Sequence, residues 1–213
     1  KMLTIKKLIF NPFGENTYII WDKSKEAAII DPGMMSDYEN SVVLKFVTDN
    51  QLNLRHLINT HAHIDHIAGN GFVKRTFGLE SECNKADEYL AKHVCEQAQM
   101  FGLRYNGNPL SIDIHLNDND TIKIGDESLS VIYVPGHTKG HIALYSQQSD
   151  CVFTGDALFR QSIGRTDLPG GDYATLIRSI TGRLMNLPET TAIYPGHGEN
   201  STIGFEKANN PYI

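Results

Sequence analysis

One short segment constrains this chain more than any other. Residues 59–66 read Asn-Thr-His-Ala-His-Ile-Asp-His, which places three histidines and one aspartate within six positions, directly after the strand-like run at residues 54–58. Protonated imidazoles so close together would repel one another, and neutral ones would need buried partners, whereas a divalent cation uses their lone pairs at neutral pH. The spacing His-x-His-x-Asp-His therefore predicts a metal site in a loop that follows a strand.

Three further segments end in residues that commonly bind metals. Apolar, strand-like runs lead to a glycine turn and then to His137, Asp156 and His197, in the strings Val-Pro-Gly-His, Thr-Gly-Asp and Tyr-Pro-Gly-His. This repeated order of strand, turn and ligand predicts that the side chains converge at one edge of a sheet, where the backbone holds them rigidly. The other histidines, His56 and His93 among them, stand among ordinary polar residues and are interpreted as structural or surface residues, as is His115.

The hydrophobic pattern alternates between strands and helices. The first half predicts strands at residues 3–10, 17–22, 27–31 and 54–59 and helices at 38–50 (with Ser36 as N-cap), 67–77 and 85–101. The second half predicts strands at residues 112–116, 121–124, 129–134, 142–146, 152–154 and 191–194 and helices at 173–185 and 201–208. Strands followed by helices, twice over, predict two sheets packed face to face with helices outside.

These motifs resemble, in order, those of the metallo-β-lactamase superfamily. Asp31 in Ile-Ile-Asp-Pro-Gly matches the first motif, residues 61–66 the second, and His137, Asp156 and His197 the last three. Within the superfamily the chain is most similar to the short glyoxalase II-like (hydroxyacylglutathione hydrolase-like) branch, because of Pro-Gly-His-Thr-Lys-Gly-His, Gly-Arg-Thr-Asp and Tyr-Pro-Gly-His-Gly. The resemblance implies an α/β fold of the αββα sandwich type, with two mixed sheets and helices outside, in a single domain spanning residues 1–213.

The same resemblance implies a centre of two divalent metal ions. It implies seven ligands, with Asp156 shared by both ions: His61, His63, His137, Asp65, His66, His197 and Asp156. Asp31 would orient the ligating imidazoles, although a turn residue before Pro-Gly is an equally good interpretation. His141 is expected not to bind metal. Histidine and carboxylate ligands suit zinc, iron and manganese alike. Zinc is the favoured metal, with iron or manganese as alternatives.

Hydrolysis of a small acyl thioester by a metal-bridging hydroxide is the reaction that the resemblance implies. The chain has no Gly-x-Ser-x-Gly elbow and no cysteine beside a histidine motif that would supply another nucleophile. Asp65 is the candidate for passing a proton to the leaving group. Arg165 is the candidate for binding a substrate carboxylate, with a solvated turn charge as the alternative. Phe159 and Tyr173 are candidates for the walls of the same cleft, or for the core.

A second function stays open, namely a persulfide dioxygenase with a single iron held at His63, His137 and Asp156. A binding module without activity is disfavoured because the ligand set is complete. Glyoxalase II proper has a C-terminal helical domain for glutathione, whereas this sequence ends at Ile213, so a full glutathione pocket is in doubt.

Composition narrows the partners of the protein. A net charge of −6 and a pI near 5.8 argue against binding to nucleic acid. Three widely spaced cysteines indicate free thiols and no disulfide framework. Without a signal-like start or a run of eighteen apolar residues, we expect a cytoplasmic protein with no membrane partner. The oligomeric state is left open.

Overall fold

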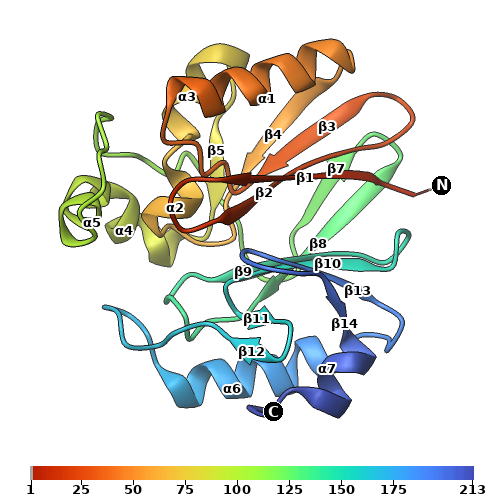
Figure 1. The fold of residues 1–213 in the computed structure, drawn as a ribbon. Helices are drawn as coiled ribbons and strands as arrows, with labels where there is room; N and C mark the ends of the chain where they lie inside the picture. Colours follow the sequence, from red (N-terminus) through yellow and green to blue (C-terminus); the bar gives the residue numbers. More distant parts are fainter. Residues whose placement is uncertain (1) are drawn as a thin grey trace.

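The computed structural model describes residues 2–213, which form two six-stranded sheets packed face to face with helices on both outer faces (Figure 1). The first sheet has the spatial order β1 (Thr4–Phe10), β2 (Glu15–Trp21), β3 (Glu26–Ile30), β4 (Asn53–Ile58), β5 (Ser81–Cys83) and β6 (Ile114–His115). The second has the order β14 (Ser201–Thr202), β13 (Ala192–Pro195), β10 (Cys151–Gly155), β9 (Ile142–Ser146), β8 (Glu127–Tyr133) and β7 (Thr121–Ile124). A small hairpin joins β11 (Leu158–Phe159) to β12 (Ser162–Ile163).

Both sheets are mixed. In the first, β3 and β4 pair in parallel while β1 and β2 pair antiparallel, and in the second, β10 is parallel to β13 and antiparallel to β9. The predicted αββα sandwich with two mixed sheets is therefore confirmed.

The space between the sheets is filled by side chains from both of them. Tyr18 and Ile20 of the first sheet belong to the same buried cluster as Leu129 and Phe153 of the second. The rings of Tyr18 and Phe153 meet edge to face, with centroids 5.2 Å apart. Strand β3 is buried from Ala27 onward on both faces, because helices cover its outer side.

Helices cover the two outer faces and one end of the sandwich. The first sheet carries α1 (Asp37–Asp49) and α3 (Asn70–Phe77), and the second carries α6 (Tyr173–Gly182) and α7 (Ile203–Asn209), which lie above and below the sheets in Figure 1. A third group consists of α2 (Ile64–Ile67), α4 (Glu88–Lys92) and α5 (Val94–Met100), and the 3₁₀ turns are η1 (Lys85–Asp87) and η2 (Leu184–Asn186). Ser36 caps α1 as predicted, since its side chain accepts from the backbone N–H of Glu39.

Several predicted boundaries are wrong. The helix expected at residues 85–101 is broken into η1, α4 and α5, and the imidazole Nδ1 of His93 binds the carbonyl of Tyr89 at 2.6 Å at the break. The helix expected at 67–77 begins only at Asn70, behind the separate turn α2, and that at 173–185 ends at Gly182. The last helix starts only at Ile203, because Ser201 pairs with β13. Thr202 is the N-cap, since its side chain accepts from the backbone N–H of Phe205.

No helix in the part of the chain from residue 2 onward is both long enough and apolar enough to span a bilayer. The thiols of Cys83, Cys95 and Cys151 are free, as expected.

Candidate metal centre

The structure brings the seven predicted ligand residues to one edge of the sandwich. Strand β4 leads into the loop with His61 and His63 and then into α2, which carries Asp65 and His66. Loops after β8, β10 and β13 of the other sheet bring in the remaining three residues, His137, Asp156 and His197.

Two groups of candidate ligands result. The ligand atoms of His61, His63 and His137 all lie within 4.8 Å of one another, and so do those of Asp65, His66 and His197. Asp156 is next to both groups, because its Oδ1 is 3.3 Å from Nε2 of His66 and its Oδ2 is 3.7 Å from Nε2 of His137.

Hydrogen bonds on the outer side fix the orientation of the imidazoles. Nδ1 of His137 donates to the carbonyl of Arg165 at 2.8 Å, and Nδ1 of His197 donates to the carbonyl of Phe13 at 3.2 Å. A carbonyl oxygen can only accept, so Nδ1 carries the hydrogen and the Nε2 lone pair faces the centre. This is the tautomer that binds a metal ion through Nε2.

Asp31 orients two more histidines. Its carboxylate accepts from the backbone N–H and the hydroxyl of Thr60, both at 2.7 Å, and from Nδ1 of His66 at 3.1 Å. Because the hydroxyl of Thr60 donates to Asp31, it accepts from Nδ1 of His61, which is 3.0 Å away. The backbone of Asp31 has a φ of 50°, which is strained for a residue other than glycine. These contacts favour the orienting role over a simple turn residue, even though Asp31 also lies within ligand distance of His61 and His66.

Unpartnered buried atoms show that these residues fit a metal ion. His61 Nε2 is buried without a hydrogen-bond partner, and His66 Nε2 and Asp156 Oδ1, which lie 3.3 Å from each other, form no hydrogen bond either. The inward nitrogens of His63 and His137 are 2.9 Å apart, so their lone pairs face the same point. Leaving such groups unsatisfied costs about 1–3 kcal/mol each, and a cation at the centre would satisfy them together. Nitrogen and oxygen donors without sulfur suit zinc, iron or manganese.

The electrostatics of the two groups differ. Burial, together with neighbouring imidazoles, lowers the pKa of His61 well below its usual range and that of His63 to about 3. Burial alone would also lower the pKa of His66, but the carboxylates of Asp156 and Asp65 hold it well above its usual range. The pKa of Asp65 is low in spite of burial, because of His66 and His197. The first group is therefore neutral and the second is rich in charge.

His141 is buried but is already engaged. Its ring stacks on that of His61 with centroids 4.9 Å apart, and its Nε2 accepts from the backbone N–H of Asp156 at 3.0 Å. It therefore supports Asp156 instead of facing the centre. Gly164 also approaches Asp156 closely, since a Cβ atom there would lie 1.8 Å from the carbonyl oxygen of Asp156. Only glycine fits at that position.

A cavity of about 280 Å³ opens over the centre. Its lining is Phe13, His63, Asp65, Phe101, His137, Asp156, Arg165, Leu168 and His197. The rings of Phe13 and Phe101 form one apolar wall, edge to face with centroids 5.6 Å apart, and Arg165 forms part of another wall.

Of the two locations predicted for Phe159 and Tyr173, the cavity walls or the core, the cavity walls are wrong. Phe159 and Tyr173 do not belong to the lining, since the ring of Phe159 lies behind that of His197 at 6.1 Å and Tyr173 is 54% exposed on α6. Phe13 and Phe101 were missed because they come from a hairpin turn and a helix end, where an aromatic residue is not part of any recognisable motif. The other histidines were interpreted correctly: His56 binds Glu82 across two strands and His115 pairs with Glu88 at the surface.

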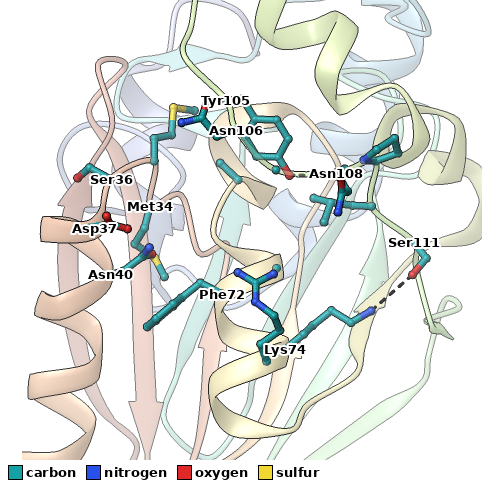
Figure 2. A pocket seen from close by; sticks show the side chains of 17 residues that line it. Met34, Ser36, Asp37, Asn40, Phe72, Lys74, Tyr105, Asn106, Asn108 and Ser111 are labelled. Atoms are coloured by element: carbon teal, nitrogen blue, oxygen red, sulfur yellow. Dashed lines mark hydrogen bonds between the residues drawn. The ribbon is translucent and has the colours of Figure 1, made fainter.

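A larger cavity, of about 580 Å³, lies elsewhere, between the start of α1, α3 and residues 105–111 (Figure 2). Met34, Asn40, Phe72 and Tyr105 are among its lining residues, and Lys74 extends toward Ser111 at its edge. None of the seven candidate ligands lines it, whereas five of them line the smaller cavity.

Comparison with known proteins agrees with this geometry. The sequence profile of the metallo-beta-lactamase superfamily matches residues 10–197. A hydroxyacylglutathione hydrolase, GloC of Haemophilus influenzae, is 38% identical over 218 residues, covering 99% of this chain and 98% of that protein.

Solved structures are similar over nearly the whole chain. The BLEG-1 B3 metallo-beta-lactamase has a TM-score of 0.90 at 33% identity and covers 98% of this chain and 99% of its own. TTHA1623 in a di-iron-bound form has a TM-score of 0.87 at 32% identity, with 98% and 100% covered. ETHE1 from Myxococcus xanthus has a TM-score of 0.79 at 28% identity, with 98% and 83% covered.

Proposed function

Because this chain belongs to the metallo-beta-lactamase superfamily of metal-dependent hydrolases, we propose that it hydrolyses a small acyl thioester at a centre of two divalent metal ions. The observation that carries the proposal is the convergence of two groups of inward-facing donors, with Asp156 next to both, at the floor of one cavity. The similarity to a hydroxyacylglutathione hydrolase over the full length of both proteins supports a thioester as the substrate.

In this proposal His61, His63 and His137 hold one ion, Asp65, His66 and His197 hold the other, and Asp156 binds both. Zinc is the proposed metal, and iron and manganese are alternatives that the same donors accept. When bound, the ions supply a water of lowered pKa and polarise the substrate carbonyl.

Asp65 is the proposed proton carrier. Its Oδ2 is 3.1 Å from Nε2 of His197, and the side chain also lines the cavity, so it reaches both the centre and a bound substrate. A carboxylate in this position accepts a proton and delivers it to the departing thiolate. The side chain of Asn11 fixes the backbone of Asp65, since Asn11 Nδ2 donates to the carbonyl of Asp65 at 3.0 Å.

The cavity walls indicate the kind of substrate. Phe13, Phe101 and Leu168 offer apolar contacts to an acyl chain or a thiol stem, while Arg165 offers a cation to a carboxylate. A volume of about 280 Å³ favours a small acyl group with the rest of the thiol outside the cavity.

Persulfide oxidation at a single iron is the second candidate. It is favoured by the closeness of three of the donors, since His63 and His137 approach to 2.9 Å and Asp156 lies 3.7 Å from His137. The di-iron form of one similar structure supports iron as the metal, although not the presence of a single ion. Residues His63, His137 and Asp156 would hold that iron.

The test uses protein purified without chelator. Elemental analysis should give two metal equivalents per chain, and hydrolysis of a hydroxyacylglutathione should be followed by thiol release. Oxygen uptake with glutathione persulfide and cleavage of a β-lactam are assayed in parallel. One iron per chain with oxygen uptake and no thiol release would replace thioester hydrolysis by the second candidate.

A further inference from the structure

Two buried polar side chains of the helical segment 85–100 hold the loop that carries His61 and His63. They are Asp87, at the end of η1 and fully buried, and Gln97 of α5, which is 8% exposed. Neither belongs to the predicted ligand set, and neither faces the cavity over the centre.

Asp87 joins two loops through one carboxylate. Its Oδ2 accepts from the backbone N–H of Ala62 at 3.1 Å and from the hydroxyl of Thr138 at 2.7 Å, and its Oδ1 accepts from the backbone N–H of Gly140 at 2.6 Å. Ala62 lies between His61 and His63, and Thr138 follows His137 directly. The carboxylate of Asp87 therefore links the two loops that carry these three histidines, which come from opposite sheets.

Gln97 supports the same loop from its other side. Its Nε2 donates to the carbonyl of Ala62 at 3.1 Å and its Oε1 accepts from the backbone N–H of Ile64 at 3.0 Å, so both peptide groups beside His63 are held. Ile64 opens α2, which carries Asp65 and His66, so Gln97 holds backbone groups that adjoin ligands of both groups. Asp87 touches the backbone of only one.

The second group is oriented by other residues. Within residues 2–213, Asp87 has no hydrogen bond to Asp65, His66 or His197 or to their nearest neighbours. His66 is held by Asp31, His197 by the carbonyl of Phe13, and the backbone of Asp65 by Asn11. Gln97 and Asp31 thus support both halves of the centre, whereas the hydrogen bonds of Asp87 reach only the half that contains His61, His63 and His137.

We propose that Asp87 is a positioning residue for the ion held by His61, His63 and His137, and that it sets the affinity of that ion without setting the affinity of the other. The inference rests on the metal centre of the proposed function but not on thioester hydrolysis. Its test therefore measures metal binding alone.

Asp87→Asn is the informative substitution because it keeps the shape. An amide has one acceptor oxygen, and its NH₂ group must face either the N–H of Ala62 or that of Gly140, so one of the two loops loses its partner. Asp87 is fully buried and the N–H of Gly140 is only 2.6 Å from Oδ1, so the amide has little room to move away.

Glu206→Gln is the matched control. Glu206 is equally buried, and it accepts from the backbone N–H of Gln161 at 2.8 Å, from Nδ2 of Asn210 at 2.9 Å and from the hydroxyl of Ser201. None of these contacts involves a candidate ligand. The control therefore has the same chemical change in a buried carboxylate while leaving the centre untouched.

In the experiment, metal-free wild type, Asp87→Asn and Glu206→Gln are titrated with Zn²⁺ against a chromophoric chelator, which yields a dissociation constant for each ion. Anomalous scattering from crystals grown at limiting zinc shows which position is filled. For Asp87→Asn we expect the affinity at His61, His63 and His137 to fall by about 10- to 100-fold, the usual range for an outer partner of metal ligands, with the other ion within threefold of wild type.

Equal weakening of both ions, no change in either, loss at the other position, or the same selective loss in Glu206→Gln would overturn the proposal. If wild type binds a single ion at His61, His63 and His137, the two-metal part of the proposed function is wrong, but the effect of Asp87→Asn is still measured on that ion. A single ion in the other group would contradict both.

Discussion

Arg165 donates through Nε and Nη2 to the two carboxylate oxygens of Asp167, at 2.7 and 2.8 Å, while its own carbonyl accepts from Nδ1 of His137. One residue therefore orients a candidate ligand with its backbone and places a guanidinium at the cavity with its side chain. The side chains of the pair are 54% and 67% exposed, so their attraction is weakened by water and a substrate carboxylate can compete for the guanidinium.

Replacing Arg165 by alanine should separate these two roles. For a thioester that bears a carboxylate, we expect KM to rise roughly tenfold or more, in keeping with the loss of a hydrogen bond between charged groups worth about 1.5–3 kcal/mol, with kcat less affected. An uncharged thioester should show little change, and the metal content should match wild type because the carbonyl that holds His137 is retained. Equal effects on both substrates would remove Arg165 from substrate selection.

Asp167→Asn should act in the opposite direction. Arg165 holds the pKa of Asp167 down, to about 2, so Asp167 is ionised at neutral pH and competes with an anionic substrate. Neutralising it should lower KM for the carboxylate thioester by roughly two- to fivefold, since exposed pairs are weak. Steady-state kinetics on the same two thioesters provides the measurement. A higher KM would mean that Asp167 positions Arg165 for the substrate instead of competing for it.

Asp65→Asn should keep the fold and lower turnover by several orders of magnitude. The amide can neither balance the charge of a bound metal nor carry a proton to the leaving group. Circular dichroism, metal analysis and kcat on the same preparation distinguish a loss of bound metal from a loss of proton transfer in a protein that is still folded. A variant with wild-type turnover and wild-type metal content would show that Asp65 has neither role.

His56, which lies away from the centre, is expected to contribute to the free energy of unfolding in a way that depends on pH. Its Nδ1 is 2.7 Å from Oε1 of Glu82 and its Nε2 is 2.9 Å from the carbonyl of Lys123, so it connects β4 to β5 and to β7 of the other sheet. The hydrogen bond to Glu82 raises the pKa of His56 above its ordinary value of 6.5. A group whose pKa is raised on folding stabilises the protein fully below its unfolded pKa and loses that effect as the pH rises through the folded pKa.

We therefore expect His56→Gln to lower the free energy of unfolding by about 1 kcal/mol at pH 6 and by clearly less at pH 9. Urea unfolding at the two pH values measures this difference. The same loss at both would show that the charge on His56 is unimportant and that only its neutral hydrogen bonds matter.

The position of the centre could be predicted from the sequence because each candidate ligand follows a strand. Once β4 and β10 are recognised, the chain direction at the end of each strand brings His61 and Asp156, which come from different sheets, to the same edge of the sandwich. The αββα layers follow from the same alternation of strands and helices.

The supports of the centre could not be predicted in this way. Asp87 stands in the polar string Lys-Ala-Asp-Glu, which is typical of an exposed helix start, and only the packing of η1 against two distant loops buries it. Glu15 lies before the strand predicted at residues 17–22, yet it begins β2 and is fully buried, and burial raises its pKa well above the usual range. Strand β5 is only three residues long, too short for any alternation to be recognised.

The candidate ligands come from both sheets, with His61 to His66 following β4 and the other three following strands of the second sheet. An ion coordinated across both sets acts as a crosslink between the halves of the sandwich, and only the native chain offers it that site. Free metal at 100 times its dissociation constant adds about 2.7 kcal/mol to the free energy of unfolding for each such ion. If the proposed centre binds metal in this way, we expect the supply of metal to set how long the protein survives proteolysis, in addition to how fast it turns over substrate.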